Sequence, residues 1–351
     1  MKQLILTLDY ELYGNGSGNI YTHIIEPTER ILTLAEQYKA KITFFVEVVE
    51  FWRIEEEWLK GNTMGYDKNP IDDIRRQLQT AHKQGHDIQL HIHPQWVDAE
   101  YKNDAWSVNL NDWRLGGYCK QGENSLENLL KKGKTTLEEW IKPVDNNYEC
   151  IALRAGGYNI QPSCELVKAM QATGLKVDSS IYPGGKETGS LSNYDYSNIA
   201  ADKEMWQTGN ELEKEGTSGI YELPIVAFPI KRWKKFASIE RIKSLLQNRK
   251  SAKDSFEAKT SSGDGKKSSK LDKIKYFFEQ EWQTWDYCLF SPSLHNHFLR
   301  EIKKQKNRKY FTLVGHPKGY MGGNGFKHLL KKSDKEFAYN TIKDFYNEIH
   351  L

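Results

Sequence analysis

The sequence lacks the features that define several protein classes. No stretch approaches the roughly eighteen consecutive apolar residues of a membrane-spanning helix, so a membrane span is excluded. The four cysteines are widely spaced and form no CxxC pair, which disfavours both a disulfide framework and a zinc knuckle. The N-terminal run 2–9 is short and ends in an acid, so it indicates a first strand rather than a secretory signal. We therefore expect a cytoplasmic protein.

The sequence also has no large excess of positive or negative charge, because its net charge is only +3. Residues 249–275 hold nine Lys/Arg and four Asp/Glu, a local +5, which leaves the rest of the chain slightly acidic. This argues against a nucleic-acid-binding surface built into the fold. We interpret 249–275 as a flexible, solvated insertion, with attraction to anionic lipid or phosphate as the alternative.

Short β-branched and aromatic runs alternate with longer helical patterns, as in parallel βα units. We expect strands at 3–8, 41–46, 86–93, 148–153, 176–180, 220–225 and 310–314. Helices are predicted at 28–38, 71–84, 125–141, 164–173, 239–248, 271–287 and 333–349. The segments 97–124 (a lid-like loop) and 184–219 are predicted to be irregular insertions. The pattern indicates one barrel-like or wound α/β domain over residues 1–351, with insertions.

Polar residues of selected types follow the strands at their carboxyl ends, where functional groups of such folds collect. They are Asp9, Glu11, His91, His93, Arg154, Asp178 and His316. The period of two places Asp9 and Glu11 on one face, and likewise the two histidines. Two imidazoles and one carboxylate are the ligand set of a catalytic metal site with an open position. Each residue alone has a structural alternative: a cap, an ion pair or a buried histidine with its hydrogen bonds satisfied.

These residues lie in motifs that resemble the NodB-type polysaccharide deacetylases, carbohydrate esterase family four. The resemblance covers about residues 3–318, without the basic insertion. It rests on TLDYE at 7–11, KITFFV at 41–46, GHDIQLH at 85–91, HIHPQW at 91–96, RAGGY at 154–158, VDSS at 177–180 and LVGHP at 313–317.

The resemblance implies a distorted (β/α) barrel of about seven parallel strands and metal-dependent removal of an acyl group from an amide. Asp9 would be the general base, oriented by Arg154. His316 would be the general acid, supported by Asp178. Glu11, His91 and His93 would bind the metal; zinc is the first expectation, and nickel, cobalt and iron share its ligand preferences.

The motifs depart from the family pattern at three points. The usual adjacent acid pair is Asp-Tyr-Glu here. The usual second histidine, four residues after the first, is Gln95, so its role is assigned to His93. Gly156 stands where the arginine motif usually has a proline.

The expected partner is a small-molecule or saccharide substrate. Trp96, Trp106, Trp113 and Tyr118 follow the histidine motif and would either form a sugar platform or pack in the core or lid. Of these, Trp96 and Trp113, together with Tyr158, are the substrate-binding candidates. A cytoplasmic location favours a soluble precursor, such as a nucleotide-linked or lipid-linked sugar, over a cell-wall polymer. The sequence does not indicate an oligomeric state.

Two other functions are compatible with the sequence. A glycoside hydrolase on a similar barrel would use two carboxylates and no metal, with Asp9 and Asp178 as its candidates. A catalytically inactive relative would bind carbohydrate without releasing acetate.

Overall fold

Strands and helices alternate along the chain, and the computed structural model describes residues 1–236, 242 and 278–351. The main sheet consists of β1 (Lys2–Tyr10), β2 (Ile42–Glu47), β3 (Asp87–Ile92), β6 (Ala152–Ala155), β7 (Val177–Asp178), β10 (Trp206–Gln207), β11 (Tyr221–Glu222), β14 (Tyr310–Leu313) and β15 (Phe337–Tyr339). Three separate two-stranded antiparallel sheets are β4 (Glu100–Lys102) with β5 (Ala105–Ser107), β8 (Lys186–Thr188) with β9 (Asn193–Asp195), and β12 (Ala227–Lys231) with β13 (Gln280–Thr284). The helices are α1 (Glu26–Gln37), α2 (Val48–Leu59), α3 (Pro70–Lys83), α4 (Leu126–Ile141), α5 (Cys164–Thr173), α6 (Arg232–Phe236), α10 (Pro292–Lys304), α11 (Asn324–Ser333) and α12 (Ile342–Glu348).

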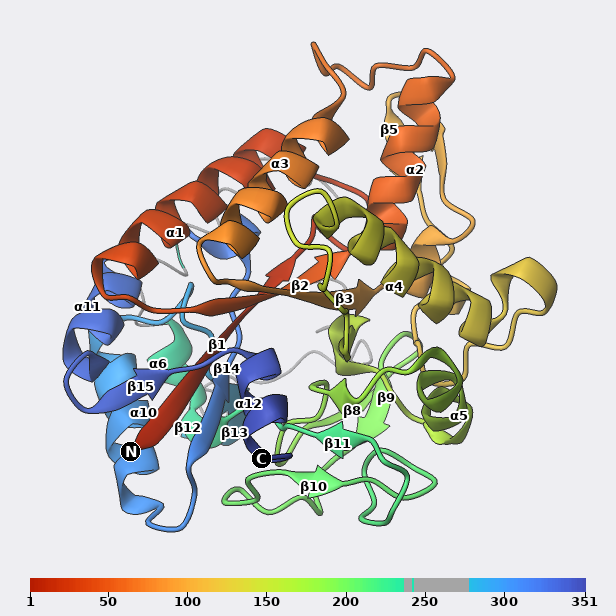
Figure 1. The fold of residues 1–351 in the computed structure, drawn as a ribbon. Helices are drawn as coiled ribbons and strands as arrows, with labels where there is room; N and C mark the ends of the chain where they lie inside the picture. The colour runs from red at the N-terminus through yellow and green to blue at the C-terminus, as the bar shows by residue number, and fades with distance from the viewer. Residues whose placement is uncertain (237–241, 243–277) are drawn as a thin grey trace, which may run out of the picture.

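The main sheet is strongly curved (Figure 1). Parallel pairing runs from β14 through β1, β2, β3, β6 and β7 to β11. Beyond β11, Ile225 forms a parallel bridge to Thr312 of β14, and the Val226 N–H donates to the Thr312 carbonyl at 2.8 Å. These contacts connect seven parallel strands in sequence around a ring. The predicted α/β fold, a distorted barrel of about seven parallel strands, is therefore confirmed.

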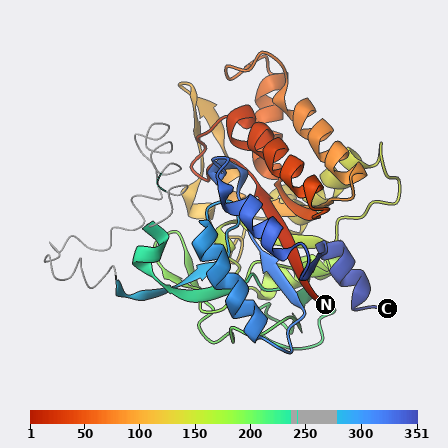
Figure 2. The same cartoon turned by 90° about the vertical axis from the view of Figure 1, so that its left-hand side faces the viewer.

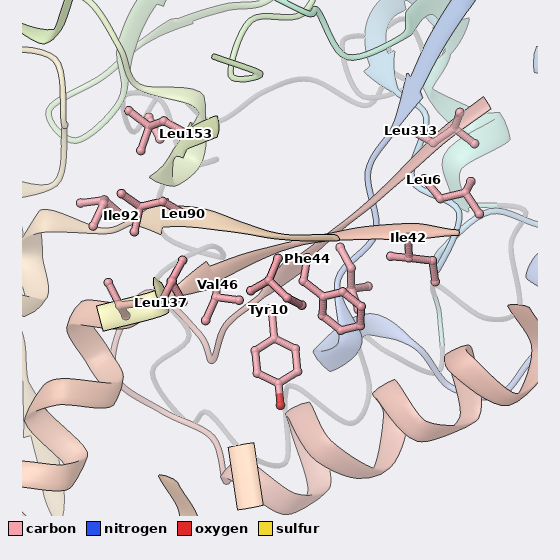
Figure 3. Packing of buried hydrophobic residues seen from close by; sticks show 14 of the residues in the cluster. Leu6, Tyr10, Ile42, Phe44, Val46, Leu90, Ile92, Leu137, Leu153 and Leu313 are labelled. Atoms are coloured by element: carbon pink, nitrogen blue, oxygen red, sulfur yellow. The ribbon is translucent and has the colours of Figure 1, made fainter. Parts of the chain in front are cut away.

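Side chains alternate between the two faces of this sheet. Even-numbered residues of β1, such as Leu6 and Tyr10, pack between the sheet and the helices (Figure 3). Ile5 instead belongs to a smaller cluster on the inner face, which also holds residues of β2, β6, β7 and β14. Because the period of a strand is two, Asp9 lies on the inner face with Ile5, and Arg154 lies there with Ala152.

Caps and turn residues explain several helix boundaries. Asn69 accepts a hydrogen bond from the Ile71 N–H at the start of α3, where Pro70 fits the first turn. Gly174 ends α5 with φ +75°, a conformation that glycine adopts without a steric penalty. The boundaries of these two helices agree with those predicted from the sequence to within one residue.

Three sequence predictions need correction. Residues 280–284 form β13 rather than the end of a helix, and they pair with β12 in a two-stranded sheet that projects from the barrel beside α6 (Figure 2). The helix predicted at 333–349 is divided into β15, which pairs with β1, and α12, which begins at a Thr341 capping box. The predicted loops 97–124 and 184–219 contain short hairpins.

The helix predicted at 239–248 and the basic insertion 249–275 lie outside the described residues, except residue 242. Among the helices of the described residues, none is long and apolar enough to cross a membrane.

Candidate active site

The inner-face residues at the carboxyl ends of the strands form one cluster. Asp9 and Glu11 follow the same face of β1, His91 and His93 the same face of β3, and Arg154 lies in β6 directly beside His91 in register. All five are buried, with exposed fractions of 5 % or less. The alternation predicted from the sequence therefore brings both pairs into the same interior.

Glu11, His91 and His93 form a group that could hold a metal ion. The His93 Nε2 atom lies 2.7 Å and the His91 Nε2 atom 3.5 Å from the same Glu11 oxygen, Oε2. Both Nε2 atoms are buried, and apart from this Glu11 oxygen neither has a polar partner among the described residues. Two buried ring nitrogens that converge on one carboxylate oxygen are the donor set that a divalent cation prefers.

The groups behind the two rings bear on their tautomers. His91 Nδ1 lies 2.8 Å from the Arg154 carbonyl, which only accepts, so Nδ1 bears the proton and Nε2 is free to bind an ion. The amide nitrogen of Gln95, Nε2, lies 2.9 Å from His93 Nδ1. The amide oxygen of Gln95, Oε1, is buried without a hydrogen-bond partner among the described residues. If the amide turns over, it gives up its 3.3 Å hydrogen bond to the Gly14 carbonyl, Oε1 accepts from His93 Nδ1–H, and the His93 Nε2 becomes a ligand in the same way. Gln95 thus contacts the rear of the His93 ring rather than Glu11.

Gly156 explains how a histidine two residues after the first can enter this group. A Cβ at Gly156 would lie 2.4 Å from His93 Nδ1, closer than real Cβ contacts. The His93 ring therefore occupies space that a side chain at position 156 would fill. Two of the three departures from the deacetylase pattern, His93 and Gly156, are complementary to each other.

Arg154 fixes the position of Asp9. The guanidinium is fully buried and donates from Nη1 to Asp9 Oδ1 and to the Thr7 hydroxyl, each at 2.6 Å. It also donates from Nε to the Ser179 carbonyl at 2.7 Å and stacks on Phe45, with Cζ 4.1 Å from the ring centroid. A charge-assisted pair held from several sides has little freedom to rotate. Asp9 is consequently presented to the site through its second oxygen, Oδ2.

His316 lies on the other side of Asp9, with Nε2 3.5 Å from Asp9 Oδ2. Its Nδ1 lies 3.0 Å from Asp286 Oδ2, and its side chain is 23 % exposed, more than the other residues of the cluster. Burial alone would lower the pKa of His316, but the hydrogen bond and charge of Asp286 raise it above its usual value. A histidine paired in this way is able to hold a proton near neutral pH.

The carboxylate that supports His316 is Asp286 and not Asp178, which corrects the sequence prediction. Val177 belongs to the inner cluster, so its neighbour Asp178 lies on the opposite face of β7. There Asp178 accepts from the Ser180 N–H and hydroxyl, each at 3.0 Å, and lies beside Glu222 in register. Asp286 follows β13, in a segment predicted to be helical, so the predicted strands did not place it at a strand end.

Three further residues surround Glu11 and were not predicted. Lys318 donates from Nζ to Glu11 Oε1 at 3.1 Å and to the Leu12 carbonyl at 2.6 Å. Burial would raise the pKa of Glu11, but Lys318 and the two histidines lower it well below its usual value. Glu47 and Glu50 are also buried nearby, and burial raises the pKa of both well above the usual range. The spacing His316-x-Lys318 follows the same period of two that identified the histidine pair.

The aromatic candidates have different positions. The Trp113 ring lies edge-on to His93, with centroids 6.0 Å apart, and is half-buried. Tyr158 follows Arg154 at φ +63°, a strained conformation for a non-glycine residue, and is also half-buried. Trp96 is completely buried against Trp106, so it packs in the core and has no surface for a substrate, contrary to the sequence prediction.

No protein-family model and no curated protein matches the chain. Three solved structures that it resembles have different activities, and each is 11% identical. A Mycobacterium smegmatis protein assigned as a polysaccharide deacetylase has a TM-score of 0.45, with 99% of this chain and 91% of that chain covered. PuuE allantoinase has a TM-score of 0.47, with 99% of this chain and 90% of that chain covered. The 4-alpha-glucanotransferase of Thermococcus litoralis has a TM-score of 0.43, with 99% of this chain and 41% of that chain covered. Likeness at this level assigns no activity to the chain.

Proposed function

We propose that the chain is a metal-dependent hydrolase that removes an acetyl or other acyl group from an N-acylated sugar or a related amide. The observation behind the proposal is the convergence of the buried His91 and His93 Nε2 atoms on one oxygen of Glu11, beside an Asp9–Arg154 pair. The two nitrogens and the Glu11 carboxylate converge in one buried region, an arrangement that a divalent cation would stabilise.

Glu11, His91 and His93 would hold the ion, with zinc as the first candidate and nickel, cobalt or iron as alternatives. A divalent cation with an open position supplies a nucleophilic water at neutral pH and polarises the amide carbonyl. Asp9 would be the general base that takes the proton from the attacking water. Because Arg154 holds Oδ1 of Asp9, Oδ2 is the oxygen available for that proton.

His316 would act as the general acid. Cleavage of an amide requires that the leaving nitrogen be protonated, and the Asp286 carboxylate favours the protonated form of His316. The base and the acid lie side by side, with His316 Nε2 3.5 Å from Asp9 Oδ2. One proton therefore enters the site at Asp9 and another leaves it from His316, as acyl transfer to water requires. Trp113 and Tyr158 are the proposed substrate contacts.

The structure disfavours the glycoside hydrolase alternative on one specific point. Its second carboxylate would be Asp178, which is completely buried on the opposite face of β7 from Asp9. The other alternative, an inactive relative that binds carbohydrate, predicts a binding site in which Asp9 is not needed. The cytoplasmic location and the soluble sugar precursor remain predictions.

The test combines metal analysis with an assay for acetate release. Purified protein is expected to contain about one transition-metal ion per chain, and to release acetate from N-acetylglucosamine, its oligomers or its nucleotide-linked form. His91→Ala should lose the ion, while Asp9→Asn should keep it and lose activity by about 10²–10⁴-fold. His82→Ala is the matched control, since His82 pairs with Asp145 outside the site. A wild-type protein without metal, or sugar binding without acetate release, would contradict the proposal.

A further inference from the structure

Lys318 is the charged neighbour of Glu11 that the proposed reaction does not use. Its Nζ lies 3.1 Å from Glu11 Oε1, while the histidine nitrogens face the other oxygen, Oε2. The carboxylate is thus divided, with one oxygen toward the resident ammonium and one toward the proposed metal position. The Leu12 carbonyl accepts from the same ammonium at 2.6 Å and fixes it in place.

The surroundings keep this ammonium close to Glu11. The Lys318 side chain is only 14 % exposed, and its Nζ lies 5.3 Å from the centroid of the Tyr13 ring, an arrangement that favours a cation. Lys318 lies within the 3-10 turn Pro317–Gly319, which begins directly after His316. A turn closed by backbone hydrogen bonds, with Gly319 N–H donating to the His316 carbonyl at 3.0 Å, limits how far the lysine can withdraw.

A second set of potential ligands overlaps the first at Glu11. Asp9, Glu11 and His316 also lie close enough to hold an ion. Each member of this set already has a partner of its own: Arg154 on Asp9, Asp286 on His316 and Lys318 on Glu11. Two of these partners are cations, which would repel a second metal ion in this buried region. The arrangement therefore favours one ion and not two.

We propose that Lys318 is a positioning residue of the metal centre: it holds Oε1 of Glu11, so that Glu11 binds the ion through Oε2 alone, and its charge weakens the binding of that ion. This inference rests on the proposed function. A carboxylate that keeps one oxygen on an ammonium cannot chelate, which leaves a coordination position for water. The positive charge acts against a divalent cation bound to the same carboxylate, so the metal is held less tightly than the ligands alone would allow.

The experiment measures Zn²⁺ and Co²⁺ binding to the wild-type chain, Lys318→Gln and Lys318→Arg, by competition with a chelating dye. Lys318→Gln removes the charge and, because the side chain is shorter, also the donor that holds Oε1, so its affinity should rise by about tenfold or more. Lys318→Arg keeps the charge and should remain within about threefold of the wild type. The visible absorption of bound Co²⁺ should weaken in Lys318→Gln, because chelation by Glu11 raises the coordination number.

Lys134→Gln is the matched control. Its side chain is also 14 % exposed and lies beside Glu138 and Glu149, outside the site, so metal affinity should not change. Thermal unfolding of each variant verifies folding. An unchanged or weaker affinity in Lys318→Gln, or two ions per wild-type chain, overturns the inference and leaves the proposed hydrolase intact. A wild type that binds neither cation overturns both.

Discussion

Gly156→Ala tests whether the close approach of His93 to the backbone is what builds the metal centre. The new Cβ would lie 2.4 Å from His93 Nδ1, and contacts below 3.0 Å are essentially never seen, so the ring or the turn has to retreat by at least 0.6 Å. Metal–ligand distances tolerate about 0.2 Å. The displacement is thus about three times the tolerance. We expect the affinity for Zn²⁺ or Co²⁺ to fall by about tenfold or more.

The same substitution has a modest cost in stability. Overpacking costs about 1–3 kcal/mol, and the loss of glycine freedom in the unfolded chain offsets about 0.4–1 kcal/mol of it. Dye competition measures the affinity, and thermal unfolding measures the stability. Gly209→Ala is the control, because its Cβ would meet the Glu215 carbonyl at 3.0 Å in the loop after β10. Equal metal affinity in Gly156→Ala and the wild type would refute the proposed relation between Gly156 and His93.

Asp286→Asn removes the charge that raises the pKa of His316, so the alkaline limb of a kcat pH profile should move to lower pH; an unmoved limb would exclude His316 as the acid. Burial and Asp178 raise the pKa of Glu222 well above 4.5, so the folded chain keeps a proton that the unfolded chain loses. As pH rises from about 5, Glu222→Gln should therefore gain stability over the wild type by up to about 1.4 kcal/mol per unit, up to the folded-state pKa, in urea titrations. Arg154→Met leaves Asp9 buried and unpaired, and urea unfolding should show a loss of about 3–5 kcal/mol.

The strand pattern predicted which residues of the site share a face, because the two pairs of ligands and acids depend only on the local period of a strand. Asp9 with Glu11 and His91 with His93 each lie two residues apart, and one correctly predicted strand places each pair on one face. The side of the sheet that Asp178 faces depends on the exact register of β7, which has only two residues, so a shift of one residue reverses the answer.

Other contacts depend on tertiary structure that one sequence does not show. Asp286 reaches His316 across 30 residues, from a segment whose composition suggests a helix but which pairs with β12 and β14. Trp96 lies next to the histidine motif and looks available to a substrate, but a 3-10 turn directs its ring into the core. Proximity in the sequence to a functional motif did not determine whether a side chain is accessible.

The position of β1 between β2 and β14 has a consequence for biosynthesis. The Thr7 hydroxyl donates to the Leu313 carbonyl at 2.6 Å, across 306 residues. On the ribosome β1 emerges long before β14, so one of its edges has no strand to pair with until residue 313 has been made. Unpaired edges invite association with other chains. A nascent or truncated chain that ends before β14 should therefore depend on chaperones, whereas the finished chain closes its own edge.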